Sequence, residues 1–278
     1  MSPVESVLFW AALLLYSLAA GGYSYSIIFK NEKVMPRLIV AIAAGALLHT
    51  FAIAARVYAQ GHFPWSSDYD NGLMGGWFII MATLYVVWRQ KPLRILGAAT
   101  LPAVILIMGY GVMRRPVLEP MSATLKSFWL YIHVFFAWIS FGAYALAMGA
   151  GVVYLLRERA REKGAETGYY EQFPTQERLD ELMFRYLVFG FVNNAVMIAA
   201  GAIWAKDLWG NYWSWDPVET WSLVSWLMYG LAIHLRVTMG WRGSRFAWIA
   251  VLALSTVIIN FFGVTLVAKS SLHMFNVR

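Results

Sequence analysis

The sequence predicts an all-α, polytopic integral membrane protein, a helix bundle with about eight transmembrane helices. The composition is the first indication, because 60% of the 278 residues are hydrophobic and only 13% are charged. Apolar stretches of the roughly 20 residues needed to cross a bilayer recur along the whole chain. The basic residues collect in alternate connecting segments, as they do in multi-pass membrane proteins.

The predicted spans cover residues 4–29, 37–58, 72–88, 92–113, 128–156, 182–204, 217–237 and 246–268. The first is not expected to be a cleaved signal peptide, because Met1 to Val7 carries Glu5 and no Lys or Arg. No repeat period, low-complexity tract or soluble domain interrupts the series. We therefore expect one integral membrane domain over residues 1–278.

Four connecting segments hold 15 of the 22 basic residues and are predicted to face the cytoplasm: 30–37, 89–94, 157–185 and 236–245. The alternate segments, with the N-terminus, then lie outside: 59–71, 114–127, 205–216 and 269–278. Both termini are expected on the extracytoplasmic side. The expected location is a bacterial cytoplasmic (inner) membrane, with a thylakoid membrane as the alternative.

Charge and cysteine content restrict the possible chemistry. The net charge of +7 is explained by the topology rule and is spread over four loops, so we expect no nucleic-acid binding. The chain contains no Cys, which excludes disulfides and thiolate metal sites. Any metal must be bound by His or oxygen ligands.

Residues 204–221, at the predicted outer face, contain five Trp and one Tyr. An aromatic belt at the membrane–water interface is one interpretation. Two features favour a binding surface instead. Gly210 follows Trp209, and an extended Trp213-x-Trp215 would point both rings the same way. Such a surface suits a large, flat, apolar ligand.

Asp216 and Glu219 belong to an Asp-Pro-x-Glu motif that is typical of a helix start. Asp216 is expected at the N-cap, Pro217 at the first helical position and Glu219 in a capping box. Such a cap would hold the Trp-rich segment rigidly, and a bound anionic group would lie near the positive end of the helix. We expect neither carboxylate to act as a general acid or base.

His133 and His273 are predicted to share the outer side. His133 lies about five residues into its span, about 8 Å below the outer surface, and its helix face continues through the small Ala137 and Ser140. His273 follows the last span. The two histidines could clamp a metalloporphyrin through two axial nitrogens. For each of them, packing within the bundle is the alternative.

His234 lies about 17 residues into its span, roughly 25 Å from the Trp-rich segment. If it binds iron it marks a second site, whose other ligand would come from another chain. The alternative is a buried, hydrogen-bonded His. His49 and His62 are expected to be structural or gating residues. Four basic residues near the outer helix ends could pair with propionates, with ordinary interfacial positions as the favoured alternative: Arg56, Arg114, Arg115 and Lys126.

The segment Trp209-Gly210-Asn211-Tyr212-Trp213-Ser214-Trp215-Asp216-Pro217-Val218-Glu219-Thr220-Trp221 resembles the signature loop of the haem-handling WWD-domain cytochrome c assembly family. Its flanking Asn-Tyr and Glu-Thr-Trp are similar to the CcsA or ResC type of system II, whose short form is also called CcsB. The resemblance extends over essentially the whole chain. It implies a protein that works with a ResB/CcsB-type membrane partner, carries haem outward and presents it for covalent attachment to apocytochrome c.

The resemblance also implies roles for individual residues. His133 and His273 look like the external axial ligands of a non-covalent b-type haem, and His234 like the transmembrane His. The haem-binding loop would be residues 204–221, with five contributors: Trp209, Trp213, Trp215, Asp216 and Glu219. The sequence departs from the family around His273, where Val267-Ala268-Lys269-Ser270-Ser271 replaces the usual Gly-rich approach.

The working hypothesis is that haem enters from the cytoplasm, pauses at His234 with a partner residue, and moves to His133 and His273. There a Cys-x-x-Cys-His segment of apocytochrome c would receive it, so that the chain forms part of a holocytochrome c synthase (haem lyase) complex. A permanent haem-b electron carrier is the alternative, and it predicts ligand pairs on facing helices. A transporter is the third, and it predicts broken helices or buried midmembrane carboxylates.

Overall fold

The computed structural model describes residues 1–65, 67–114, 117–118, 123–165 and 168–264, and within these ranges the chain forms helices and no strand. The eight α-helices in these ranges are α1 (Pro3–Ile28), α2 (Met35–Gln60), α3 (Asp68–Arg89), α4 (Gly97–Met113), α5 (Phe128–Glu162), α6 (Gln176–Trp209), α7 (Pro217–Thr238) and α8 (Ser244–Ile258). Short 3₁₀ segments cover Glu32–Val34, Lys91–Leu96, Ala123–Leu125 and Gly168–Gln172, and a π-helical segment, Ile259–Gly263, follows α8. The all-α prediction is confirmed.

The helices are those of a multi-pass membrane protein. Among the described residues, seven helical segments are long and apolar enough to cross a membrane. α7 is not one of the seven, because its aromatic, hydroxyl and charged side chains make it less apolar than the others. Its 22 residues nevertheless rise about 33 Å, which matches a hydrocarbon core of about 30 Å.

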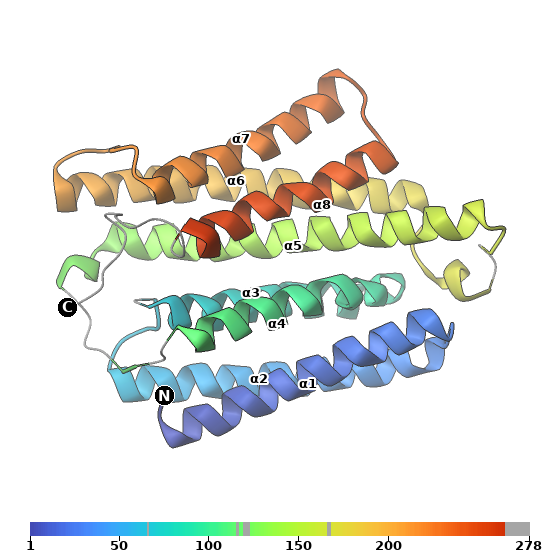
Figure 1. Ribbon diagram of the computed structural model, residues 1–278, viewed down its shortest axis with the longest axis horizontal. Coiled ribbons are helices and arrows are strands. Elements are labelled where there is room, and N and C mark those ends of the chain that lie inside the picture. Colours follow the sequence, from blue (N-terminus) through green and yellow to red (C-terminus); the bar gives the residue numbers. More distant parts are fainter. Residues whose placement is uncertain (66, 115–116, 119–122, 166–167, 265–278) are drawn as a thin grey trace.

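The helices lie side by side along the long axis of the molecule, and successive helices run in opposite directions (Figure 1). α1 packs on α2, α3 on α4, and α5 on both α6 and α8. The four connections predicted to be cytoplasmic lie at one end of the bundle, and the N-terminus and the Trp-rich loop lie at the other (Figure 1). The predicted alternation is therefore present. The assignment of the two ends to membrane sides stays a prediction, and residues 265–278 lie outside the described residues.

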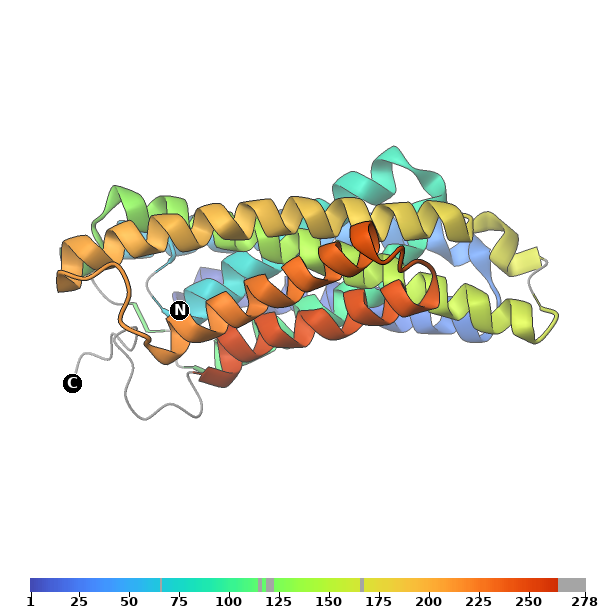
Figure 2. The ribbon, with the colours of Figure 1, turned by 90° about the horizontal axis from the view of Figure 1, so that it is seen from above.

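α5 and α6 are the longest helices and form the wall on which α7 and α8 pack (Figure 2). Their 35 and 34 residues exceed the roughly 20 needed for one membrane span, and at the basic end both helices extend past the predicted spans, 128–156 and 182–204. The connection between them is thus shorter than the predicted segment 157–181. It is held by Arg157, which donates to the carbonyl of Phe173 (3.1 Å), and by a bond between the hydroxyls of Tyr169 and Ser26 (2.9 Å). Burial raises the pKa of Tyr169.

A buried charged cluster ties the first three helices together at the end that carries the N-terminus. Arg56 is fully buried, with Nε 3.0 Å from Asp70 Oδ1 and Nη1 3.5 Å from Glu5 Oε1. Its guanidinium also lies 4.7 Å from the ring centroid of Tyr69 and donates to the carbonyl of Val117 (2.9 Å). Arg56 is therefore an interior residue, and both predictions for it, a propionate ligand and an interfacial residue, are wrong.

The other three basic residues near these helix ends differ from Arg56. Arg114 lies at the end of α4 and pairs with Asp68 (3.0 Å) on the surface. This contact raises the pKa of Arg114. Lys126 is exposed, and Arg115 lies outside the described residues.

Candidate functional site: a pocket beneath the Trp-rich loop

The Trp-rich loop connects α6 and α7 within the Trp-rich segment 204–221. The start of α7 fixes its C-terminal end, as the Asp-Pro-x-Glu motif predicts. Asp216 is the N-cap residue, and its Oδ1 accepts a hydrogen bond from the Val218 amide (2.9 Å). Glu219 completes the capping box by accepting from the Asp216 amide (3.3 Å). Pro217 occupies the first helical position, where its missing N–H costs nothing.

The Glu219 carboxylate also holds the loop that precedes the helix. Its Oε2 accepts from the amide of Ser214 (2.8 Å) and from the hydroxyl of Ser214 (3.1 Å). Asp216 and Glu219 are 6% and 9% exposed. Because Glu219 satisfies three donors at once, its role in this structure is to position the loop.

The near end of the loop is fixed by the end of α6. Gly210 caps the helix with a φ of +82°, a left-handed conformation that favours glycine. Lys206 donates to the Gly210 carbonyl (2.6 Å). Trp204 is buried, donates from Nε1 to the Thr124 carbonyl (3.3 Å), and packs edge-on against Trp209 with ring centroids 5.3 Å apart.

Trp213 and Trp215 do not form the shared surface that an extended backbone would give. Trp215 has a φ of +60°, so the chain turns at this residue instead of continuing as a strand. The two rings are nearly perpendicular (86°), with centroids 5.9 Å apart. Trp213 lines the pocket described next, whereas Trp215 is 70% exposed.

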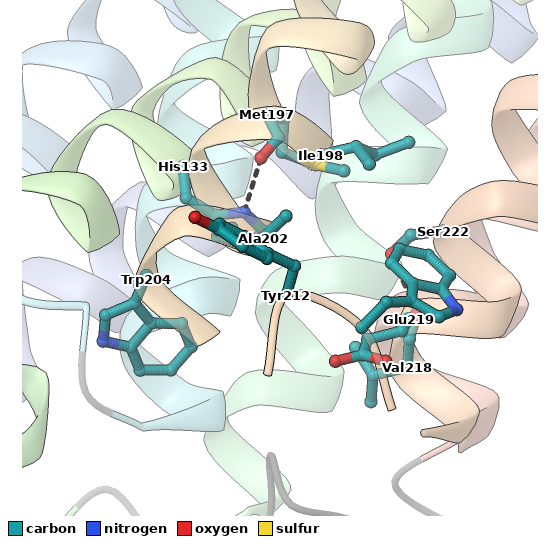
Figure 3. A pocket seen from close by; sticks show the side chains of 11 residues that line it. His133, Met197, Ile198, Ala202, Trp204, Tyr212, Val218, Glu219 and Ser222 are labelled. Carbon is teal, nitrogen blue, oxygen red and sulfur yellow. Dashed lines mark hydrogen bonds between the residues drawn. The ribbon is translucent and has the colours of Figure 1, made fainter. Parts of the chain in front are cut away.

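A pocket of about 400 Å³, partly open to solvent, lies between α5, α6, α7 and the loop (Figure 3). Tyr212 projects into it, with Trp204 on one side and Glu219 and Ser222 on the other in this view (Figure 3). Its walls are His133, Met197, Ile198, Gly201, Ala202, Trp204, Tyr212, Trp213, Val218, Glu219 and Ser222. The mainly apolar lining with a few polar side chains is typical of a small-molecule site.

His133 contributes the imidazole of this pocket, and α6 sets the orientation of the ring. Nδ1 lies 2.9 Å from the Met197 carbonyl oxygen, and because a carbonyl can only accept, Nδ1 carries a proton and donates it (Figure 3). Gly201 makes this approach possible, because a Cβ at that position would lie 2.5 Å from Nδ1. An imidazole whose Nδ1–H is held by a carbonyl is the usual form of a metal-binding His.

The other predicted iron ligands are placed differently. His273 lies outside the described residues. His234 is exposed on the outer surface of α7, and its Nδ1 lies 3.3 Å from Thr238 Oγ1. The alternative of a buried His234 is wrong, because its side chain is exposed on a face of α7 that turns away from the described part of the bundle. Exposed apolar residues, Leu227 and Leu231, share that surface.

An ion pair fixes the end of α7 that carries His234. Arg236 donates to Asp180 on α6 (Nη1 to Oδ1, 2.9 Å), and the same carboxylate accepts from the amide of Gly243 (2.8 Å). The guanidinium also lies over the ring of Phe246, 5.0 Å from its centroid. The rotation of α7, and with it the outward direction of His234, is thereby set by interactions with α6 and α8.

The two remaining histidines have local partners. His49 is fully buried, with Nε2 2.9 Å from the Leu73 carbonyl and Nδ1 3.3 Å from the Tyr16 hydroxyl. This supports a structural role. His62 lies in the outer loop, with Nδ1 2.8 Å from the Phe63 carbonyl.

Several pocket residues were not predicted from the sequence. Tyr212 lies within the loop that was singled out, but the direction of a loop side chain has no local sequence signal. Met197 and Gly201 lie on α6 and acquire their roles only where this helix meets His133. The small Gly201 in an apolar span was the one available signal, since small residues let neighbouring groups approach a helix closely.

Comparisons with known proteins identify the family of the chain. The family model described as "Cytochrome C assembly protein" matches residues 65–272. Cytochrome c biogenesis protein CcsA of Synechococcus sp. (strain CC9902) is 32% identical over 292 aligned positions, which cover 95% of each chain. The CcsA proteins of Guillardia theta and Porphyra purpurea are 31% and 29% identical over 81% and 80% of this chain.

A solved structure shares the fold. The protein titled Cytochrome c Heme Lyase CcmF superposes with a TM-score of 0.72 over 94% of this chain, at 16% sequence identity. This chain spans 47% of the length of that protein. On the family match and on the CcsA relatives, the chain belongs to the cytochrome c assembly protein family, and it is a CcsA-type membrane component of cytochrome c biogenesis.

Proposed function

We propose that the chain binds haem at the extracytoplasmic face, beneath the Trp-rich loop, and presents it for covalent attachment to apocytochrome c. Haem is the substrate here, held non-covalently as b-type haem until it is attached. The observation that carries the proposal is His133, whose ring is oriented by the Met197 carbonyl inside a pocket walled by indole rings. His273 is proposed as the second axial ligand.

The pocket has the properties that a metalloporphyrin requires. Trp204 and Trp213 supply flat apolar walls, and His133 supplies an axial nitrogen. The N-terminus of α7 forms one edge of the pocket, and the carboxylates of Asp216 and Glu219 already complement its positive end. Lys206, at the end of α6, adds a positive charge near the loop.

The attachment reaction needs positioning more than acid–base catalysis. Each Cys thiol of the Cys-x-x-Cys-His segment adds across a vinyl group: a carbon–sulfur bond forms, and the thiol proton goes to the other vinyl carbon. Asp216 and Glu219 are committed to the helix cap, so the proposal gives neither a proton-transfer role. The chain contributes by holding haem where the incoming thiols and histidine reach it.

The proposal also includes a partner. His234 faces away from the bundle at the end opposite the Trp-rich loop, where a bare imidazole in the hydrocarbon region is costly. A ResB/CcsB-type membrane subunit packed on this face of α7 would supply a second ligand and receive haem from the cytoplasm. In this proposal the two subunits together form the holocytochrome c synthase, and haem passes from His234 to His133.

The test is the absorption spectrum of the reduced, purified complex. Replacing both His133 and His273 with Ala is expected to abolish haem at the outer site and the production of c-type cytochromes, while His62→Ala in the outer loop serves as a control with normal haem. An unchanged spectrum and yield in the double variant would discard the proposal. The electron-carrier alternative gives a separate result, because haem would then remain on the chain when apocytochrome c is supplied.

A further inference from the structure

A second pocket adjoins the first and reaches into the middle of the bundle. It lies between α5, α6, α7 and the π-helical segment after α8, and its empty space of about 260 Å³ includes a part that is open to solvent. Met197 and Ser222 line both pockets, so the two are neighbours along one seam. The remaining lining residues are Ala137, Ser140, Phe141, Tyr144, Asn194, Ser225, Val257, Asn260 and Phe261.

The lining of this second pocket mixes apolar side chains with several polar, uncharged ones, which is unusual for the interior of a membrane bundle. Asn194 and Ser225 are 5% and 2% exposed, and both contribute polar atoms to the cavity. Asn194 Oδ1, Ser225 Oγ and Asn260 Oδ1 have no hydrogen-bond partner among the described residues. Each such buried group costs about 1–3 kcal/mol if nothing satisfies it. A cluster of three around one cavity points to a ligand.

The unpaired atoms define the chemistry of that ligand. The amide nitrogens of Asn194 and Asn260 already donate, to the Tyr144 hydroxyl (3.3 Å) and to Ser222 Oγ (3.0 Å). The remaining amide oxygens are acceptors, so the ligand must bring donors. Among the described residues, none that lines the cavity is charged, so an ion would have no countercharge there. A water molecule is a donor and an acceptor, and it is neutral.

A local distortion of the last helix supports a built site. Asn260 lies in the π-helical segment Ile259–Gly263, where backbone hydrogen bonds join residues five apart instead of four. Such segments are rare and are frequent at functional sites. Here the segment faces α7, and Asn260 reaches Ser222, whose hydroxyl donates to the Val218 carbonyl (2.8 Å).

A pair of stacked tyrosines lies at the inner end of the cavity. The rings of Tyr144 and Tyr229 are parallel within 1°, with centroids 3.5 Å apart, and both are buried. Gly190 leaves the space for Tyr144, because a Cβ there would lie 2.5 Å from the ring. Leu187 lies about one turn before Gly190 on α6, toward the basic end of the bundle, and is fully buried in the apolar core.

We propose that this cavity is a water-binding chamber, continuous with the outer pocket through Met197 and Ser222 and closed toward the opposite end by Tyr144 and Tyr229. Water then enters from the end of the bundle that carries the Trp-rich loop and reaches the middle of the bundle. It does not pass through to the opposite end. Water in the chamber satisfies the unpaired amide and hydroxyl groups. The inference stands on the side chains of the cavity and does not depend on haem.

The absence of Cys from the chain gives a direct test in the full-length protein. Single variants Ser225→Cys and Ser140→Cys place a thiol in the chamber, and Ala145→Cys, next to Tyr144 but outside the lining, places one at the same depth in the dry core. Only a hydrated thiolate reacts with a small methanethiosulfonate, so the chamber variants should react at least about tenfold faster than Ala145→Cys. Unreacted thiols are counted by mass spectrometry after denaturation.

A second variant locates the entrance. Adding Ser222→Phe to Ser225→Cys should reduce labelling to the Ala145→Cys level, because the bulky ring fills the neck between the two pockets. Equal labelling of Ser225→Cys and Ala145→Cys, whether slow in both or fast in both, would overturn the proposal. So would persistent labelling with Ser222→Phe present.

Radiolytic hydroxyl-radical footprinting of the unmodified protein covers the case in which the Cys variants do not fold. Bound water generates radicals beside it, so Tyr144 should be oxidised several-fold more than Tyr16, which is equally buried and lies outside both pockets. Equal oxidation of the two tyrosines would show a dry cavity and overturn the proposal.

Discussion

His133 on α5 and Met197 on α6 are 64 residues apart in the sequence, and a 2.9 Å contact from the imidazole Nδ1 to the Met197 carbonyl joins them. The contact fixes both the tautomer and the direction of the ring. It depends on a helix–helix approach that only a glycine permits, at position 201.

Gly201→Ala should displace the His133 ring and lower the haem content of the purified complex, because the new methyl group would lie 2.5 Å from Nδ1. Gly21→Ala is the matched control, since a Cβ there meets nothing within 4 Å. Alanine is favoured over glycine by about 0.5–1 kcal/mol within a helix, so the control should be as stable as the parent or more so. Equal haem content in both variants would argue against a role for Gly201 in orienting His133.

Glu219→Ala should loosen the Trp-rich loop, because the carboxylate accepts from Ser214 and from Asp216. Losing a capping interaction typically costs about 0.5–2 kcal/mol, and the freed buried donors add to this. We expect a lower thermal midpoint and a shifted Trp emission. Glu171→Ala, which removes an exposed carboxylate from the opposite end of the bundle, should change neither.

Arg56→Leu should be among the most destabilising substitutions in the chain. It leaves the buried carboxylates of Glu5 and Asp70 without their cation, and breaking a buried pair costs about 3–5 kcal/mol. Arg114→Leu removes the surface pair with Asp68 and should cost about 0–1 kcal/mol. Unfolding midpoints in detergent compare the two, and similar losses would contradict the interior assignment of Arg56.

His234→Ala and His49→Ala should have opposite effects. His234 is exposed, so its loss should leave the stability of the isolated chain unchanged and reduce only the haem bound by the complex with its partner. His49 is buried with both ring nitrogens in contact, so its loss should lower the thermal midpoint of the isolated chain. A His234→Ala chain that unfolds early on its own would show that His234 is structural.

The order of the helices and several of their ends could be predicted from the sequence. Hydropathy, basic loops and caps are local signals, and each describes what a short segment prefers in a bilayer or in water. The start of α7 illustrates this, because Asp216, Pro217 and Glu219 form the predicted cap. The cluster of Trp residues before this cap is also a local signal, and it predicted that the candidate pocket lies at this loop.

Other features could not be predicted, because they depend on which faces of the helices meet. Arg56 looked like an interfacial residue, yet Glu5 and Asp70 from two other helices make it a buried one. His234 was weighed as a buried residue, yet the packing of α7 turns it outward. No local pattern distinguishes the two outcomes.

By itself, the sequence determined a multi-pass helical bundle, the alternation of its connections, the capped helix beneath the Trp-rich loop and the candidate residues of the outer site. The tertiary structure decided the rest: the direction of His133, the turn at Trp215 that separates it from Trp213, and the polar chamber around Asn194. The physical reason is the range of the forces involved. Hydropathy and capping act within a few residues, whereas hydrogen bonds and packing across helices exist only after distant segments have come together.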